Sequence, residues 1–346
     1  MLTAIATDQH FGCRKNSKLF HDYFLEFYDN VFFPTIEKNN IKTVLDLGDT
    51  FDNRKTIDFA ALEWAKTHYY DKLHSLGCKV YTVVGNHTAY YKNTNSINAV
   101  DLLLREYDNV EVISEPKEIT IGNLPILFIP WINQENEQKT FNLIKNTKCS
   151  VAMGHLELSG FAAHIGHIME EGQDKKIFSK FDKVFSGHYH TRSNDGRIFY
   201  LGNPYEIYWN DVNDTRGFHL FDTETLSLEP VNNPYRLYYQ IYYDDTKEFE
   251  IDYSTYQNKI VKLIVKNKSD SIKFENFVDS LYEHNVAELK IVENFNLEEN
   301  FIFEELESEH TLSIVNKYIQ ESSIDLEKSK IKTIFEDIYK EACELI

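Results

Sequence analysis

The sequence has few of the features that mark membrane or secreted proteins. Its uninterrupted apolar runs are strand-sized, far short of the roughly 20 residues that a membrane-spanning helix needs. The first residues, MLTAIATDQH, contain neither a basic region nor a cleavage site. Only four cysteines occur among 346 residues and none forms a C-x-x-C pair, which suits a reducing compartment. We therefore expect a cytoplasmic protein, the host cytoplasm if it is viral, with buried or idle thiols.

Basic residues are scarce as well. The chain has 36 lysines and arginines against 55 aspartates and glutamates, a formal net charge of −19. This balance argues against a protein that coats nucleic acid over its whole surface, because such binding needs a broad basic face. A local groove remains compatible with it, and an acidic chain can act on phosphates where metal ions supply the positive charge. That chemistry needs specific ligands.

Strands and amphipathic helices alternate through the first two hundred residues. Residues 2–8 have the pattern of a strand, and residues 18–39 carry apolar side chains at helical spacing. The scheme repeats with strands at 42–49 and 79–87 around a helix at 59–77, a βαβ pattern that predicts a parallel sheet core. Denser strands then predict a second sheet packed on the first, at 118–123, 125–131, 150–158, 183–190, 197–204 and 217–225. Residues 159–180 form a long connection that is expected to be a functional loop.

A turn signal and a tyrosine cluster mark a domain boundary near Asn232, in NNPYRLYYQIYYDD. The expected organisation is a first domain at 1–231 and a small α/β module at 232–292. Residues 293–310 contain seven glutamates and no lysine or arginine, which predicts an acidic linker. Two amphipathic helical patterns follow at 311–346.

Polar residues follow five of the predicted core strands at their carboxyl ends, where open α/β sheets collect their ligand sites. They stand in TDQH, GDTFD, GNH, GHLE and SGHYH and are Asp8, His10, Asp49, Asp52, Asn86, His87, His155, His188 and His190. A mixture of carboxylate, amide and imidazole suits manganese, iron or zinc, whereas an all-oxygen set favours magnesium or calcium. Two such ions can share a carboxylate and clamp the attacking and leaving oxygens of a phosphoryl centre.

Each motif alone is weak evidence, because D-x-H and H-x-H are common and a single buried histidine is more often a satisfied core residue than a ligand. Glycine directly before four of these residues strengthens the set, since a residue without Cβ lets the chain bend as the strand ends. The four are Asp49, Asn86, His155 and His188. The ordered set therefore predicts a metal site.

The series D-x-H, GD-x-x-D, GNH, GH and GH-x-H resembles the calcineurin-like metallophosphoesterase superfamily, roughly over residues 1–205. Within it, the chain is most similar to the SbcD-type DNA double-strand-break-repair nuclease, particularly its T-even-like phage version. The stretches that carry this resemblance are GDTFDNRK (48–55), GNHTAYYKN (85–93), GHLELSG (154–160), LGNPYEIYWND (201–211) and RGFHLFDTET (216–225). The resemblance implies an α/β fold, a two-sheet β-sandwich flanked by helices, with a small capping domain and a C-terminal helical pair.

The resemblance also implies roles for the motif residues. Two manganese ions are expected, with magnesium or other divalent ions as alternatives. Asp8, His10 and His190 match the ligands of one ion. Asn86, His155 and His188 match those of the other, and Asp49 matches the bridge. His87 matches a histidine that assists the leaving oxygen, and Asp52 matches the carboxylate that orients that histidine. Family members usually read GNHD or GNHE, so Thr88 is a departure.

The expected function is a DNA exonuclease or endonuclease that acts at DNA ends as the nuclease subunit of a recombination and repair complex. The module at 232–292 is expected to cap the site. Residues 311–346 are expected to dock on an SMC-like ATPase of the SbcC type, or else to fold back on their own core, and a homodimer is implied. The residues expected to contact the DNA backbone, or alternatively to form a solvated rim, are Arg54, Lys55, Tyr90, Tyr91 and Lys92.

Two other functions fit the same motifs. A phosphomonoesterase or cyclic-nucleotide phosphodiesterase can be built on the same metal frame, since the fold does not fix the substrate. A catalytically idle subunit that organises an ATPase on DNA is the second, and the net charge of −19 is compatible with it because independent DNA binding would be weak. The complete ligand set argues against an idle site.

Overall fold

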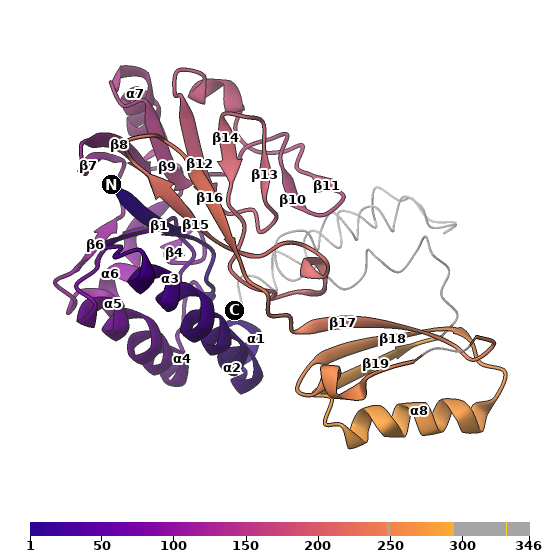
Figure 1. Cartoon of the computed structure of the whole chain (residues 1–346). Coiled ribbons are helices and arrows are strands. Elements are labelled where there is room, and N and C mark those ends of the chain that lie inside the picture. Colours follow the sequence, from indigo (N-terminus) through magenta and orange to yellow (C-terminus); the bar gives the residue numbers. More distant parts are fainter. Residues whose placement is uncertain (248–249, 294–329, 331–346) are drawn as a thin grey trace. The chain divides into compact units, whose positions relative to one another are not determined.

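Two six-stranded sheets form the centre of residues 1–232 in this computed structural model (Figure 1), which describes residues 1–247, 250–293 and 330. The first sheet has the strand order β16-β15-β1-β2-β3-β6 and the second has β13-β14-β12-β9-β8-β7. The strands of the first sheet are β1 (Leu2–Ala6), β2 (Thr43–Asp46), β3 (Lys79–Val83), β6 (Val110–Ile113), β15 (Gly217–Asp222) and β16 (Leu228–Asn232). Those of the second are β7 (Lys117–Ile121), β8 (Leu124–Ile129), β9 (Val151–His155), β12 (Lys183–Gly187), β13 (Ser193–Asn194) and β14 (Ile198–Tyr200).

Both sheets are mixed: the first has antiparallel pairing at one edge, and the second has it at both edges. In the first sheet β1, β2, β3 and β6 run parallel, as the βαβ pattern predicted, but β15 pairs antiparallel with β1. In the second, β12 runs parallel to both β9 and β14, and β7 pairs antiparallel with β8. The antiparallel edges arise because β7 and β8, and likewise β15 and β16, are joined by short turns that reverse the chain.

The two sheets pack face to face through buried apolar side chains. They include Ile5, Leu45 and Val83 of the first sheet and Phe128, Met153 and Phe185 of the second. Removing these side chains from water is the main favourable contribution to holding the sheets together. The predicted second sheet, packed on the first, is therefore present.

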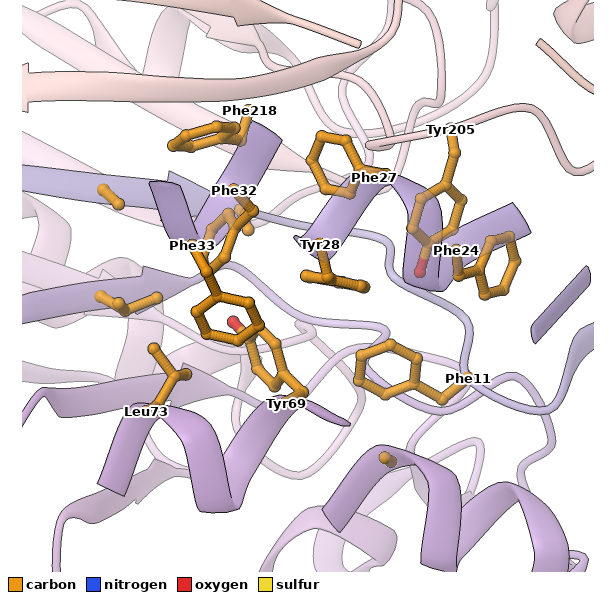
Figure 2. Packing of buried hydrophobic residues seen from close by; sticks show 14 of the residues in the cluster. Phe11, Phe24, Phe27, Tyr28, Phe32, Phe33, Tyr69, Leu73, Tyr205 and Phe218 are labelled. Carbon is orange, nitrogen blue, oxygen red and sulfur yellow. The ribbon is translucent and has the colours of Figure 1, made fainter. Parts of the chain in front are cut away.

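Helices cover the other face of the first sheet, as Figure 1 shows. The helix expected at 18–39 consists of α2 (Lys18–Phe27), a π-helical turn η1 (Tyr28–Phe32) and α3 (Phe33–Lys38); the helix expected at 59–77 consists of α4 (Phe59–Ala65), a π-helical turn η2 (Lys66–Tyr70) and α5 (Asp71–Ser75). Their inner faces form an aromatic cluster that includes Phe24, Tyr28, Phe32 and Tyr69 (Figure 2). Each π-helical turn inserts an extra residue, and such turns are frequent at functional sites.

Shorter elements complete the first two hundred residues. The connection expected as a loop at 159–180 carries a hairpin and a 3-10 turn of its own. The remaining elements are α1 (Cys13–Asn16), β4 (Ala89–Tyr91), β5 (Thr94–Asn98), α6 (Ala99–Leu104), α7 (Glu137–Asn146), β10 (Ala162–His164), β11 (His167–Ile168), η3 (Lys175–Phe178) and η4 (Trp209–Asp211).

A third sheet lies beyond Asn232, in the order β17-β18-β19, and all its strand pairs are parallel. Its elements are β17 (Tyr238–Asp244), η5 (Tyr253–Tyr256), β18 (Ile260–Asn267), α8 (Ser271–Glu283) and β19 (Glu288–Val292). The side chain of Asp270 caps α8 by accepting hydrogen bonds from two backbone N–H groups. The strand, helix and strand expected at 260–292 are thus present, and β17 joins them.

Contacts group residues 1–293 as one unit, so the boundary expected near Asn232 remains a prediction. The expected linker at 293–310 beyond its first residue, and the helical pair at 311–346 apart from residue 330, lie outside the residues that the structure describes. Among the described helices, none has the length and apolar character to cross a membrane.

Candidate metal centre

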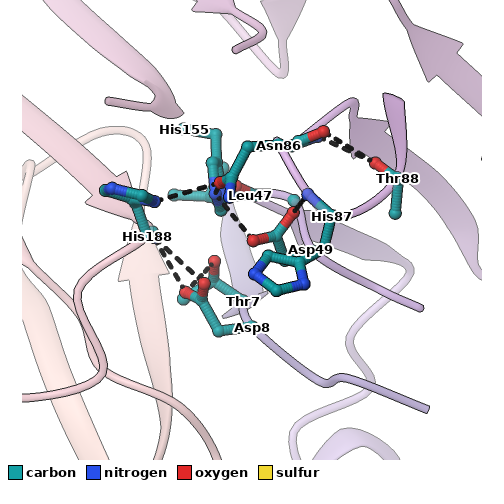
Figure 3. Close-up of polar contacts among 12 residues, drawn as sticks. Thr7, Asp8, Leu47, Asp49, Asn86, His87, Thr88, His155 and His188 are labelled. Carbon is teal, nitrogen blue, oxygen red and sulfur yellow. Dashed lines mark hydrogen bonds and ion pairs between the residues drawn. The ribbon is translucent and has the colours of Figure 1, made fainter. Parts of the chain in front are cut away.

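Eight of the nine motif residues follow the carboxyl ends of β1, β2, β3 and β12, and the ninth, His155, is the last residue of β9. Because these strands come from two sheets packed face to face, their ends converge on one region. Figure 3 shows six of the side chains together: Asp8, Asp49, Asn86, His87, His155 and His188.

The first group of side chains is Asp8, His10 and His190, whose candidate ligand atoms all lie within 4.8 Å of one another. The Nε2 atoms of His10 and His190 are 3.1 Å apart. The carboxylate of Asp8 accepts hydrogen bonds from the hydroxyl of Thr7 at 2.7 Å and from the backbone N–H of His188 at 3.0 and 3.1 Å. These bonds fix the carboxylate without using positively charged side chains.

The second group is Asp49, His155 and His188, again within 4.8 Å. Nε2 of His155 lies 3.0 Å from Asp49 Oδ2 and 2.9 Å from Asn86 Oδ1, and Nδ1 of His188 lies 3.0 Å from the same Asn86 oxygen. Nδ1 of His155 donates to the carbonyl of Leu47, which leaves Nε2 facing the group. Asp49 belongs to this group and not to the first, so its bridging role remains a prediction.

Asp52 contacts His87 in a way that the sequence did not indicate. Its carboxylate Oδ1 lies 3.1 Å from Nδ1 of His10, whereas its backbone carbonyl accepts a hydrogen bond from Nδ1 of His87 at 2.7 Å. The hydrogen bond with His87 is therefore made by the main chain of Asp52, while its carboxylate also lies within 4.8 Å of a ring nitrogen of His87. The expectation that the carboxylate orients His87 remains a prediction. Since a carbonyl can only accept, the main-chain contact places a proton on Nδ1 of His87.

The buried charges act strongly on one another. Burial lowers the pKa of His155, but the carboxylates of Asp49 and Asp8 outweigh it and raise that pKa to about 9. Burial and the neighbouring His155 lower the pKa of His188 to about 3. Burial also lowers the pKa of His190, together with His10 and Arg216. His188 and His190 are therefore neutral imidazoles, the form that offers a lone pair to a metal.

The donor set fits divalent cations. The side chains of Asp8 and Asp49 are 0% and 2% exposed, and buried carboxylates need a compensating positive charge. Each lies within 4.8 Å of imidazole nitrogens that can bind a metal in their deprotonated form, and an amide oxygen lies beside the second group. Such a mixture of oxygen and nitrogen ligands suits manganese, iron or zinc.

The glycines before the ligands serve a different purpose from the one expected. Only Gly48 has a backbone conformation that favours glycine, with φ 107°. At Gly85 a Cβ would collide with Asp49, at Gly154 with the carbonyl of Ile129, and at Gly187 with Thr7. At Gly48 a Cβ would also collide with the imidazole of His155, so all four positions require glycine for close approach to a ligand or a neighbouring strand, and only Gly48 requires it for its conformation as well.

Thr88, which departs from the usual acidic residue, closes the turn that carries Asn86 and His87. Its hydroxyl accepts a hydrogen bond from the backbone N–H of Gly85 at 3.0 Å and donates to the carbonyl of Gly85 at 3.1 Å. The side chain is fully buried. A hydroxyl satisfies both groups at once, whereas an ionised carboxylate has no proton to donate.

Three residues of the site were not among those predicted from the sequence. Trp131 packs against His188, with ring centroids 5.3 Å apart, and Tyr208 stacks on His190 at 6.0 Å. Arg216 is buried, forms ion pairs with Asp211 and Asp214 at 2.8 and 3.0 Å, and its guanidinium contacts the carbonyl of His190. A signal existed for each of them, since Trp131 ends the predicted strand PILFIPW, Tyr208 lies in LGNPYEIYWND and Arg216 begins RGFHLFD.

The residues expected to contact DNA lie on two surface segments. Arg54 and Lys55 follow Asp52, and Lys55 is exposed. Tyr90 and Tyr91 belong to β4, are 37% and 49% exposed, and form a T-shaped pair with centroids 4.7 Å apart. Lys92 is exposed in the turn that follows.

Comparison with known proteins gives matches along most of the chain. The model of the calcineurin-like phosphoesterase family matches residues 1–192. Exonuclease subunit 1 of Enterobacteria phage T4 is 33% identical over 285 residues, covering 82% of each chain. A subunit of the nuclease SbcCD from Staphylococcus epidermidis is 26% identical over 208 residues, covering 57% of this chain and 50% of that protein. Among solved structures, an archaeal phosphodiesterase aligns at 13% identity with a TM-score of 0.35, covering 67% of this chain and 100% of the other.

Proposed function

The chain belongs to the calcineurin-like phosphoesterase family, and from this we propose that it is a metal-dependent DNA nuclease, the nuclease subunit of a recombination and repair complex. One observation carries the proposal. Two groups of carboxylate and imidazole ligands, with His87 beside them, converge at the strand ends of a chain that matches a phage exonuclease subunit over 82% of both lengths. The substrate class comes from that similarity, because the fold itself serves many phosphate esters.

We assign the ligands in two sets. Asp8, His10 and His190 would hold one ion, Asn86, His155 and His188 the other, and Asp49 would lie between them. Manganese is the proposed ion, since the mixed donor set suits it better than magnesium. When bound, the two ions activate water and neutralise the charge that develops on the phosphate.

His87 is the proposed general acid. Its Nδ1 donates to the Asp52 carbonyl, so Nε2 is the nitrogen left to hydrogen-bond or protonate the leaving oxygen. The carboxylate of Asp52 faces His10 instead and would hold that ligand in orientation. Asp52 thus positions both imidazoles, one through its main chain and one through its side chain.

The first prediction separates metal binding from turnover. We expect His87→Asn to bind metal normally yet lose about 10²–10⁴-fold in turnover, because the general acid is gone and the proposed ligands remain. We expect Asp49→Asn to lose both, because a carboxylate of the second group is removed. Calorimetric metal binding and DNA hydrolysis measure the two properties. Cleavage like that of the wild type by either variant would contradict these roles.

The proposed partners are DNA, an ATPase and a second copy of the chain. Arg54, Lys55, Tyr90, Tyr91 and Lys92 would contact the backbone of double-stranded DNA ends, and residues 232–292 would cap the site. Residues 311–346 would dock on an SMC-like ATPase of the SbcC type, in line with the names of the two relatives, which are both called subunits. A homodimer is proposed as well. A pull-down of the ATPase by the full chain, compared with a chain that lacks 311–346, tests the docking segment.

A single assay tests the function itself. We expect manganese-dependent release of nucleotides from linear duplex DNA, faster than hydrolysis of a small phosphomonoester at the same enzyme concentration. The His87→Asn protein, purified identically, controls for contaminating nucleases. Preference for the monoester would favour a phosphomonoesterase, and absence of cleavage even with the ATPase present would favour an idle organising subunit.

A further inference from the structure

Four of the proposed ligands lie on backbone with a positive φ: His188, at 86° after β12, and three residues in the loops after β1 and β2. Asp8, His10 and Asp49 have φ angles of 53°, 47° and 50°. This left-handed region is costly for residues with a side chain, and such conformations persist only where the surrounding structure holds them in place. The contacts of the two loops that carry these residues must therefore supply that constraint.

Backbone hydrogen bonds join the two loops to each other. The N–H of Asp8 donates to the carbonyl of Gly48 at 2.9 Å, and the N–H of His10 donates to the carbonyl of Asp49 at 2.9 Å. The loop after β1 and the loop after β2 thus move together. These bonds do not tie the pair of loops to the helices or to β3, so they do not by themselves set its position.

Gln9, which stands between two of the strained ligands, is fully buried and anchored at three points. Its Nε2 donates to Asp46 Oδ2 at 3.1 Å, and its Oε1 accepts a hydrogen bond from the hydroxyl of Tyr28 at 2.5 Å. Its backbone carbonyl accepts one from the hydroxyl of Tyr205 at 2.6 Å. Both tyrosines belong to the aromatic cluster of Figure 2. The aromatic cluster therefore holds the loop after β1 through Gln9.

Asp46, the last residue of β2, is also fully buried. It accepts hydrogen bonds from the loop after β2 and from β3. Its Oδ2 accepts from the hydroxyl of Thr50 at 2.7 Å and from that of Thr82 at 3.3 Å, and its Oδ1 accepts from the N–H of Gly48 at 3.2 Å. One carboxylate thereby connects the ends of β1, β2 and β3. Burial raises its pKa to about 7, which shows how costly an ionised group is at this place.

We propose that Gln9 and Asp46 are positioning residues that fix the separation and orientation of Asp8, His10 and Asp49. Neither residue belongs to the ligand groups, and both lie beneath them in the interior. Burying a carboxylate and an amide there is costly unless all their hydrogen bonds are made. These two buried side chains make hydrogen bonds to the two strained loops, and holding those loops is the role that we assign to them. The inference rests on the proposed function, because it takes the three strained residues as metal ligands.

The test compares two substitutions that each remove one hydrogen bond to the same Asp46 oxygen. Gln9→Met keeps the length and burial of the side chain but removes two of the three anchors of the loop after β1, the bond to Asp46 and the bond from Tyr28. Thr82→Val keeps shape and removes a bond from β3, which carries neither strained loop. Manganese binding to the full chain is measured by calorimetry after chelation and dialysis, with thermal unfolding of the metal-free proteins in parallel.

We expect Gln9→Met to weaken manganese binding by about 10–100-fold, as the loss of outer contacts to ligands typically does, and Thr82→Val to bind like the wild type. The conservative Asp46→Asn should retain more affinity than Asp46→Leu, since an amide oxygen can still accept from Gln9. If Gln9→Met does not fold, Tyr28→Phe, which removes one hydroxyl from Gln9, should weaken binding in the same direction.

Two results overturn the inference while leaving the proposed function intact. One is normal manganese affinity in Gln9→Met and Tyr28→Phe. The other is an equal loss in Gln9→Met and Thr82→Val, which would mean general damage to the core. If the wild type binds no divalent ion, the proposed function fails, and the inference fails with it.

Discussion

At the scale of single residues, several side chains of the centre serve two neighbours at once. Asn86 Oδ1 lies between the imidazoles of His155 and His188 at 2.9 and 3.0 Å. Asp52 faces His10 with its carboxylate and His87 with its carbonyl. Because the side chain and the main chain of Asp52 contact different imidazoles, a substitution of its side chain changes the contact with His10 and keeps the hydrogen bond to His87.

A substitution of Asp52 exploits that separation. Asp52→Asn keeps the carbonyl that orients His87 but removes the negative charge beside His10. We expect metal affinity to fall roughly tenfold, while turnover at saturating manganese stays within a few fold of the wild type. Titration of metal against DNA hydrolysis measures both. A loss of turnover that excess manganese does not restore would instead support the original expectation that the carboxylate acts on His87.

At the scale of elements, the strand ends leave no room for added atoms. All four ligand-preceding glycines lie where a Cβ would collide with a ligand or a neighbouring strand: Gly48, Gly85, Gly154 and Gly187. The end of β12 passes directly over Thr7 and Asp8, so the distance between the two sheets is set at this point by the absence of a side chain. Close packing transmits any expansion here to the ligands.

Gly187→Ala tests that packing. The added methyl would meet Thr7 and the Asp8 carboxylate, so we expect a loss of about 1–3 kcal/mol in the free energy of unfolding and a marked loss of metal affinity. Gly196→Ala is the control, because its Cβ would meet open space at φ 91° and only backbone strain is added. Denaturant unfolding and calorimetry report the two effects. Unchanged metal affinity in Gly187→Ala would show that β12 can shift freely.

A second element, β15, contributes a buried histidine, His219, to the space between the sheets. His219 is 5% exposed, and burial, assisted by Arg192, lowers its pKa to about 3. In the unfolded chain the imidazole gains a proton near pH 6.5, whereas in the folded chain it stays neutral until about pH 3. The unfolded state thus binds more protons in this range, and stability is lost as the pH falls from 6.5 towards 3.

His219→Gln should remove this dependence. We expect the free energy of unfolding of the variant to rise relative to that of the wild type by about 1.4 kcal/mol per pH unit below pH 6.5. Denaturant unfolding of both metal-free proteins at pH 7 and pH 5 measures the difference. An equal pH dependence in the two proteins would show that His219 is protonated in the folded chain.

At the scale of the whole molecule, an acidic chain has to bring phosphate to a centre rich in carboxylates. The net charge of −19 opposes association with DNA, and Asp8 and Asp49 add buried negative charge at the site itself. Bound cations offset both effects, since they neutralise the carboxylates and attract phosphate. Metal binding should therefore stabilise the fold as well as permit the reaction.

Metal removal tests this coupling. We expect chelation to abolish DNA hydrolysis and lower the unfolding temperature, and manganese at 100 times its dissociation constant to restore about 2.7 kcal/mol per site. Scanning calorimetry with and without manganese measures the shift. The His87→Asn protein should show the same shift, because its ligands are intact. An unfolding temperature independent of manganese would contradict a metal centre at the proposed ligands.

The sequence by itself determined the parallel strand pattern, the two sheets and the order of the polar motifs. These follow from local signals: hydrophobic period, turn residues, and short motifs at strand ends that lie close together in any parallel sheet. Tertiary structure alone decided which atom of Asp52 faces His87, why Gly187 must be glycine, and how Gln9 and Asp46 meet beneath the ligands. Each of these depends on the approach of segments that are far apart in the chain. The spacing of residues along the sequence does not say how close such segments lie in space.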